Sequence, residues 1–196
     1  PDIVALAQSA AAAGALTISL TNTRPSPLSD ACAHAIDINA GPELAVAATK
    51  SFFNSVLAGL AVLAEWTVDA DLQRSIRQLP EKLHQAITLD WKDLAAELGD
   101  ADSLYMLGRG PSLAIASEAA LKFKETSEMH AEAYSSAEVL HGPVALVDRR
   151  FPVVTFAARD AALMSVLTTA DSLAEKGALA FVTADGASHA RRLPFV

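Results

Sequence analysis

Residues 107–148, LGRGPSLAIASEAALKFKETSEMHAEAYSSAEVLHGPVALVD, decide the fold of this chain and carry most of its candidate chemistry. They contain a glycine turn, a predicted helix and a loop with a histidine. On the predicted helix, Glu118, Lys122 and Glu125 have the spacing i, i+4, i+7. At roughly 100° per residue, the three side chains point within about 60° of one direction. One helix face therefore carries an acid, a base and a second acid.

This charged face has two interpretations. The simpler one is a solvated ion pair between Glu118 and Lys122, worth roughly 0.2–0.5 kcal/mol. The other is a proton-transfer site, because a partly buried carboxylate can act as a base near neutral pH. Spacing alone favours the solvated pair.

His141 is the second candidate group, sixteen residues after Glu125 in a His-Gly-Pro turn. The apolar run VALV, residues 144–147, follows the turn and predicts a strand. An imidazole titrates near neutral pH and can exchange protons with a substrate, although a lone loop histidine more often has a surface or hydrogen-bonding role. Both roles stay open on the sequence of the turn alone.

The glycine turn 108–112 follows a predicted strand and opens a predicted helix. Free backbone N–H groups at a helix N-terminus can hold a phosphate. A tight turn that needs glycine for backbone reasons explains the same residues equally well. Arg109 is therefore no firm candidate for a ligand contact.

The rest of the chain alternates predicted helices and strands, which is typical of an α/β fold with parallel sheets flanked by helices on both faces. Pro80 suits the first turn of a helix. The predicted helices are 2–13, a largely buried 44–68, two amphipathic helices within 69–99, 113–127 and 161–176, and the predicted strands are 15–22, 35–39, 103–107, 144–147, 152–158 and 179–184.

Composition excludes several classes of function. The net charge of −8, with 15 basic and 23 acidic residues, argues against a nucleic-acid surface. Cys32 is the only cysteine, so an internal disulfide is excluded and a reducing, cytoplasmic setting is expected. The uncharged runs 3–23 and 51–64 are better explained by an alanine-rich helix with its following strand and by a short buried helix than by membrane spans, so no membrane partner is expected. Histidine and carboxylate spacing predicts no metal site and no cofactor.

Four segments resemble one known family. EAALKFKE, MHAEAY, AEVLHGPVALVD and, upstream, AGPELAVAATKSF are similar to the sugar isomerase (SIS) domains of the isomerase half of glucosamine-6-phosphate synthase and its relatives. The resemblance runs from Pro1 to about Asp185. It implies an α/β protein of two SIS lobes, each a three-layer sandwich with a parallel sheet, the first lobe being incomplete. We expect residues 1–68 to belong to the first lobe, 69–99 to form a helical connector and 100–196 to form a second lobe truncated at its C-terminal end.

The resemblance also implies roles for individual residues. Glu125 aligns with the proton-shuttling base, and Glu118 and Lys122 are its supporting residues. His141 aligns with a histidine that reaches the neighbouring subunit's site and helps open the sugar ring, which implies a homodimer. In the upstream segment, Val46 and Ala48 fall on sugar-contact positions. Ala48 stands where the synthase has a serine, so one hydroxyl contact is lost.

These roles favour a sugar-phosphate ligand and an aminosugar-phosphate isomerase or deaminase. Pro1-Asp2-Ile3-Val4 resembles the end of a serine-rich phosphate loop, and relatives continue past RRLPFV to a Schiff-base lysine, so we interpret the chain as part of a longer protein. We expect no glutaminase domain to act with this chain, which favours loss or gain of free ammonia. Two alternatives are a noncatalytic sensor of phosphosugars and a deglycase of amino-acid-linked sugar phosphates.

Overall fold

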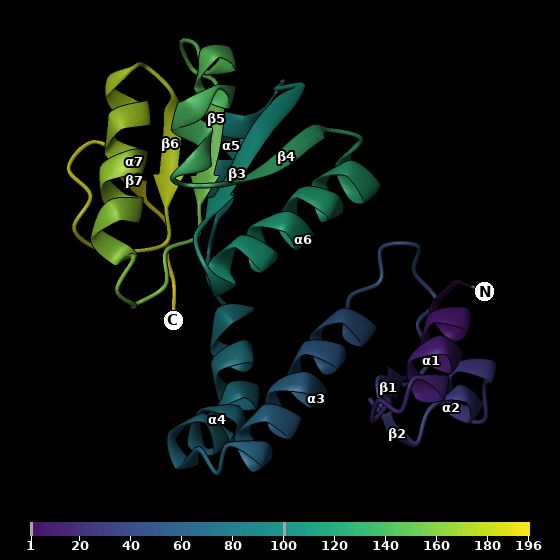
Figure 1. Cartoon of the computed structure of the whole chain (residues 1–196). Coiled ribbons are helices and arrows are strands. Elements are labelled where there is room, and N and C mark those ends of the chain that lie inside the picture. The colour runs from purple at the N-terminus through teal and green to yellow at the C-terminus, as the bar shows by residue number, and fades with distance from the viewer. Residues whose placement is uncertain (1, 100) are drawn as a thin grey trace. The chain divides into compact units, whose positions relative to one another are not determined.

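A computed structural model describes residues 2–99 and 101–196 (Figure 1). Contacts between residues divide the chain into two compact units, Pro1–Lys82 and Leu83–Val196. The boundary falls within helix α4 (Ala70–Ala86). The three-part division expected from the sequence stays a prediction, and each unit is described by itself.

The first unit contains a small parallel sheet of two strands. Strand β1 pairs with β2 from Ile18 opposite His34 to Thr21 opposite Asp37. Helix α2 begins after Ser26, whose hydroxyl accepts from the backbone N–H of Ser29 in a capping box. The elements of this unit are α1 (Asp2–Ala12), β1 (Ile18–Thr21), α2 (Pro27–Ala31), β2 (His34–Asp37), α3 (Lys50–Trp66) and the beginning of α4.

Helix α3 differs from the prediction in its start and in its burial. It begins at Lys50 rather than at Leu44, because Pro42 and the residues around it form an irregular loop. Ala64 is its one buried residue, and the apolar side chains on its outer side are 36–45% exposed: Phe53, Val56, Leu60 and Leu63. A sheet of two strands is too small to cover more than one side of this helix.

Helix α4 shows that Pro80 does not start a helix. The carboxylate of Asp69 accepts from the backbone N–H groups of Asp71 and Leu72 at 3.0 and 2.9 Å, and so caps the first turn. Pro80 therefore lies inside a continuous helix of 17 residues.

The second unit is built around a parallel sheet of five strands in the order β4-β3-β5-β6-β7. This confirms the predicted α/β class. Its helices are α5 (Lys92–Leu98), α6 (Pro111–Ser127), the two 3₁₀ turns η1 (Glu138–His141) and η2 (Pro143–Leu146), and α7 (Leu163–Glu175), and its strands are β3 (Ser103–Gly108), β4 (His130–Ser135), β5 (Pro152–Thr155), β6 (Leu179–Val182) and β7 (Arg191–Arg192).

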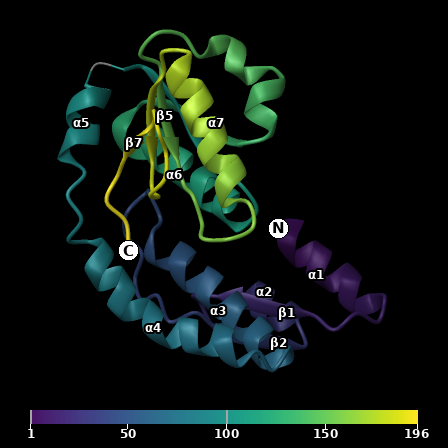
Figure 2. The same ribbon diagram turned by 90° about the vertical axis from the view of Figure 1, so that its left-hand side faces the viewer.

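Alternation along β3 divides the core of this unit into two layers. Leu104 and Met106 pack with α5 and α6 on one face of the sheet. Tyr105 and Leu107 pack with α7 and the η1–η2 segment on the other face. Figure 2 shows α5 and α7 on opposite sides of the sheet. Helices on both faces are what a buried parallel sheet requires.

The segment between α6 and β5 was predicted least well. The run VALV is a 3₁₀ turn and not a strand, because Pro143 fixes the backbone for a turn and only Val147 of the run is buried. Conversely, β4 was missed. It is an edge strand that pairs with β3 alone, so its sequence HAEAYS mixes polar and small residues instead of forming an apolar run.

Asp171 provides a test of how the second unit is held together. Its carboxylate accepts from the backbone N–H groups of Ser188, His189 and Ala190 at 2.7–3.0 Å, which ties α7 to the loop before β7. Burial opposes the charged form, but the N–H donors outweigh it and hold the pKa of Asp171 below its usual value. Because the folded-state pKa is depressed, this contribution is present above the unfolded-state pKa and is lost as the pH falls through the folded value.

We therefore predict that Asp171→Asn lowers the free energy of unfolding at pH 7 by about 1–3 kcal/mol. Thermal unfolding followed between pH 7 and pH 3 checks this, since the difference from the wild type narrows as Asp171 becomes protonated. Asp148→Asn, at an exposed position, is the matched control. An equal loss in both variants, or a difference that is independent of pH, contradicts the prediction.

Candidate functional site

The three charged residues predicted on one helix face form a single cluster on α6. The Lys122 ammonium donates to a Glu118 oxygen at 3.0 Å and to a Glu125 oxygen at 2.8 Å. The three side chains are 21–26% exposed, so the cluster is not a fully solvated surface pair. Hydrogen bonds to Glu125 and then to Glu118 raise the pKa of Lys122, which keeps it cationic at neutral pH. Lys122 therefore holds both carboxylates in fixed positions.

This cluster borders an apolar cavity of about 400 Å³ within the second unit. Lys122 contributes to its lining, together with Thr126 one turn further along α6. The other lining residues are mostly apolar: Trp91, Leu94, Met106, Ala119, Phe123, Ser127 and Phe156. Lys122 is the member of the cluster that contacts this apolar lining.

The glycine turn between β3 and α6 satisfies its own polar groups. A Cβ atom on Gly108 would lie 2.4 Å from the backbone oxygen of Ser112, so only glycine fits there. The Ser112 hydroxyl accepts from the N–H of Arg109 at 2.9 Å and donates to its carbonyl at 3.0 Å. These contacts support the tight-turn interpretation of the motif over the phosphate-binding one.

His141 ends the 3₁₀ turn η1 and is exposed. A hydrogen bond holds the backbone of the His-Gly-Pro turn, because the Tyr105 hydroxyl donates to the carbonyl of Pro143 at 3.2 Å. The Tyr105 ring packs edge-on against Tyr134 and Phe151, with centroids 5.0 and 4.7 Å away. The backbone two residues after His141 is thus tied to the aromatic core.

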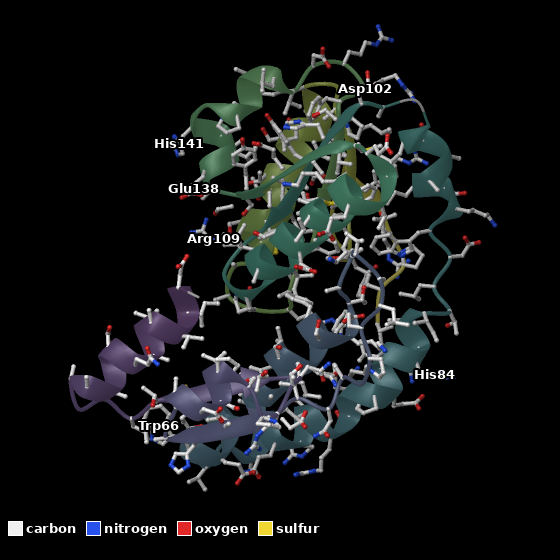
Figure 3. All side chains as sticks on the ribbon, turned by 90° about the vertical axis from the view of Figure 1, so that its right-hand side faces the viewer. Trp66, His84, Asp102, Arg109, Glu138 and His141 are labelled. Carbon is white, nitrogen blue, oxygen red and sulfur yellow. The ribbon has the colours of Figure 1, made fainter. Side chains whose placement is uncertain are left out.

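The second unit places Glu125 and His141 at opposite ends of its sheet. Strands β3 and β4 are parallel, with Ser103 opposite His130, so α6 must run back from the carboxyl edge to the amino edge between them. Glu125 lies fourteen residues into α6, about 21 Å along the helix axis from Pro111. Figure 3 shows Asp102 at one end of this unit, and Arg109, Glu138 and His141 at the other. One copy of the unit therefore does not bring Glu125 and His141 together.

Val46 and Ala48, the predicted sugar contacts, lie in the first unit in the irregular loop between β2 and α3. Val46 is 92% exposed, and its carbonyl accepts from the N–H of Ala48 at 3.0 Å. Contact of these two residues with a ligand stays a prediction.

Two contributors were not identified from the sequence. Tyr105 lies in a buried strand, where a pattern of apolar residues hides the hydroxyl that braces Pro143. Glu43 was noted only as part of a motif, yet its carboxylate holds the start of α3. It precedes Ser51 by eight residues, whereas a capping box has a spacing of three, so no local signature indicates the contact.

Two further observations concern the described residues, 2–99 and 101–196. No group of three or more His, Cys, Asp or Glu side chains among them has the arrangement of a metal site. Within the same residues, no helix is both long enough and apolar enough to cross a bilayer. The absence of a metal or cofactor in the protein stays a prediction.

Comparison with known proteins assigns the fold and these motifs to one family. The sequence model of the SIS domain matches residues 1–64 and 97–192. The chain belongs to the SIS domain family, which confirms the resemblance inferred from its motifs.

Individual relatives agree with this assignment. Mouse glutamine–fructose-6-phosphate aminotransferase (isomerizing) 2 is 40% identical over 158 residues, which are 75% of this chain and 23% of that protein. A protein of Silicibacter pomeroyi DSS-3 classed as a phosphosugar isomerase has a solved structure with a TM-score of 0.95 and 52% identity, over 99% of this chain and 59% of that one. Glucosamine-6-phosphate deaminase from Thermotoga maritima, at 23% identity, shares the fold with a TM-score of 0.71 over 91% of this chain and 56% of its own. The chain thus spans about a quarter of the mouse relative's length.

The aromatic cluster under His141 can be tested by titration. The Tyr134 hydroxyl donates to a carboxylate oxygen of Glu132, and this bond raises the pKa of Tyr134 to about 12. Burial raises the pKa of Tyr105, the other tyrosine of the chain, as well. We predict that ultraviolet titration shows less phenolate at pH 10 than two free tyrosines would give, and that Glu132→Gln makes one tyrosine ionise at lower pH, because the charge that opposes the phenolate is gone.

Glu138→Gln, an exposed glutamate in η1, is the control for this titration and should leave both tyrosines unchanged. A wild-type titration with a full phenolate step at pH 10 would refute the Tyr134–Glu132 contact.

Proposed function

We propose that this chain is the catalytic part of a phosphosugar isomerase that acts on an aminosugar phosphate, with loss or gain of ammonia at C2. The observation that carries the proposal is the cluster in which Lys122 holds Glu118 and Glu125. The SIS family and its phosphosugar isomerase relatives supply the class of substrate.

The reaction requires a base that removes a proton from one carbon and returns it to the next. In an open-chain aminoaldose phosphate, the C2 proton moves to C1 and an amine proton passes to the carbonyl oxygen, so that the C2 amine becomes an imine and the C1 aldehyde becomes a hydroxymethyl group. Water then hydrolyses the imine to the ketose and releases ammonia. Glu125 is the proposed base, because Lys122 fixes its carboxylate in a partly buried position where it can reach one face of a substrate. Glu118 fixes Lys122 from the other side.

Ring opening is the proposed task of His141. Its imidazole can donate a proton to the ring oxygen or take one from it. Because Glu125 and His141 lie at opposite ends of the sheet in one unit, we infer that His141 serves the site of a second subunit. This arrangement requires a homodimer, in which two such sites are equivalent by symmetry.

Val46 and Ala48 are the proposed sugar contacts. Both are small or apolar, and they present side chains and backbone to the ligand without a hydroxyl group. We therefore expect a sugar preference that differs from that of relatives with serine in place of Ala48.

Ammonia release from glucosamine-6-phosphate by the full-length protein tests the proposal. We expect Glu125→Gln to lower kcat by about 10²–10⁴-fold, as loss of a general base does. The thermal unfolding of this variant should stay close to that of the wild type, because the ion pair is partly exposed. Glu128→Gln, three residues further on and outside the cluster, is the matched control and should retain activity.

The other outcomes of this assay separate the alternatives. Binding of glucosamine-6-phosphate in calorimetry without turnover by the wild type would favour a sensor. Turnover of an amino-acid-linked sugar phosphate in its place would favour a deglycase. Full activity in Glu125→Gln would refute the role of Glu125.

Mixing two inactive variants tests whether His141 acts across subunits. In a dimer of one Glu125→Gln subunit and one His141→Ala subunit, a shared site receives either both defects or neither. Random exchange of subunits should then restore about one quarter of wild-type activity, since half of the dimers are mixed and each has one intact site. Sites formed within one subunit always contain a defect, so failure to restore activity would contradict the proposal.

A further inference from the structure

The loop between β2 and α3 is held in shape by side chains at both of its ends. It has no regular secondary structure from Ile38 to Thr49. An ordered loop of this length loses much backbone entropy, which contacts must offset. These contacts come from residues on either side of the predicted sugar contacts, and not from those contacts themselves.

Asn22, one residue after β1, holds the beginning of the loop. Its side-chain oxygen accepts from the N–H of Ala40 at 2.9 Å, and its amide nitrogen donates to the carbonyl of Gly41 at 2.7 Å. The Asn22 side chain thus makes the backbone hydrogen bonds that a neighbouring strand would otherwise make to these two residues. Gly41 has φ of 67°, a conformation that favours glycine, so the turn after the anchor is also specified.

Glu43 holds the end of the loop. One of its carboxylate oxygens accepts from the N–H of Thr49 at 3.2 Å, the N–H of Ser51 at 2.7 Å and the Ser51 hydroxyl at 2.9 Å. The hydrogen bond from the Ser51 N–H is the largest cause that lowers the pKa of Glu43, so the carboxylate is charged at neutral pH. Lys50 adds a bond from its ammonium to the carbonyl of Pro42 at 2.5 Å. The chain from residue 43 to residue 51 is therefore closed into a ring by a side chain.

Two large apolar side chains inside this ring are exposed to solvent. Leu44 is 94% exposed and Val46 is 92% exposed, so neither contributes to the core of the first unit. Hydrophobic burial alone would draw such side chains inward. Keeping them exposed on a fixed loop makes sense if they contact a ligand, because apolar side chains pack against the C–H groups of a sugar.

We propose that Glu43 and Asn22 are positioning residues that hold the loop so that Val46 and Ala48, with Leu44 beside them, meet the sugar. This inference rests on the proposed function, since the sugar contacts are part of it. Neither anchor touches the ligand. Their effect is to prepare the loop before binding, which reduces the entropy lost when the ligand binds.

Steady-state kinetics of the full-length protein with glucosamine-6-phosphate test this inference. We expect Glu43→Gln to raise KM about tenfold and to leave kcat within about threefold, because a preformed loop contributes to binding in the ground state and the transition state alike. Asn22→Asp should act in the same direction. Ser51→Ala, which removes one of three donors, should have a smaller effect. The matched control is Glu65→Gln, which changes an exposed glutamate on α3 and should leave KM unchanged.

Hydrogen exchange supplies a readout that does not depend on turnover. In Glu43→Gln the amides of Thr49 and Ser51 should exchange faster, with little change in the later turns of α3. Suppose that the wild type binds and turns over the sugar phosphate. This inference alone would then be overturned if both amides still exchange slowly in Glu43→Gln, or if its KM and calorimetric affinity equal those of the wild type. A wild type that does not bind the sugar phosphate at all would overturn the proposed function, and this inference with it.

Discussion

The close approach of Gly108 to Ser112 is the constraint on which the rest of the second unit depends. Strand β3 can lead into α6 through a turn of only two residues because no Cβ atom separates the two backbones. The Ser112 hydroxyl then closes the turn on Arg109. This fixed start determines the rotation of α6 about its own axis. It therefore determines that Ala116 and Ala120 face the sheet while Lys122 lines the cavity. The direction in which Lys122 points near the end of α6 thus depends on the close backbone contact at the start of the helix.

Much of this unit could be predicted from the sequence, and the failures have identifiable causes. Strands β3, β5 and β6 are short, nearly continuous apolar runs that are buried on both faces, and α6 and α7 have clear boundaries, so local patterns sufficed. Strand β4 was missed because an edge strand exposes part of its length. The VALV run was wrongly predicted to be a strand, because hydrophobic content does not show whether another strand is available to pair with it. Only the tertiary arrangement decides such cases. For α3, the composition indicated burial, but burial depends on what covers the helix.

The candidate site shows the same division. Contact among Glu118, Lys122 and Glu125 followed from helical geometry alone, since residues at these spacings are neighbours on any α-helix. The bracing of the His141 turn by Tyr105 joins residues 38 positions apart, and the Glu43 bond to Ser51 crosses an irregular loop. Neither has a periodic signal. The separation of Glu125 from His141 also needed the parallel pairing of β3 with β4, which in turn needed β4 to be recognised.

The two anchors of the loop before α3 have a consequence for how sequences of this kind can diverge. Since Asn22 and Glu43 fix the backbone from outside the segment 44–48, side chains within that segment bear little of the folding free energy. Replacing them changes what the loop presents and leaves its path intact. A lineage could therefore explore new ligand preferences at positions such as Ala48 by single substitutions, without first acquiring compensating changes elsewhere in the fold.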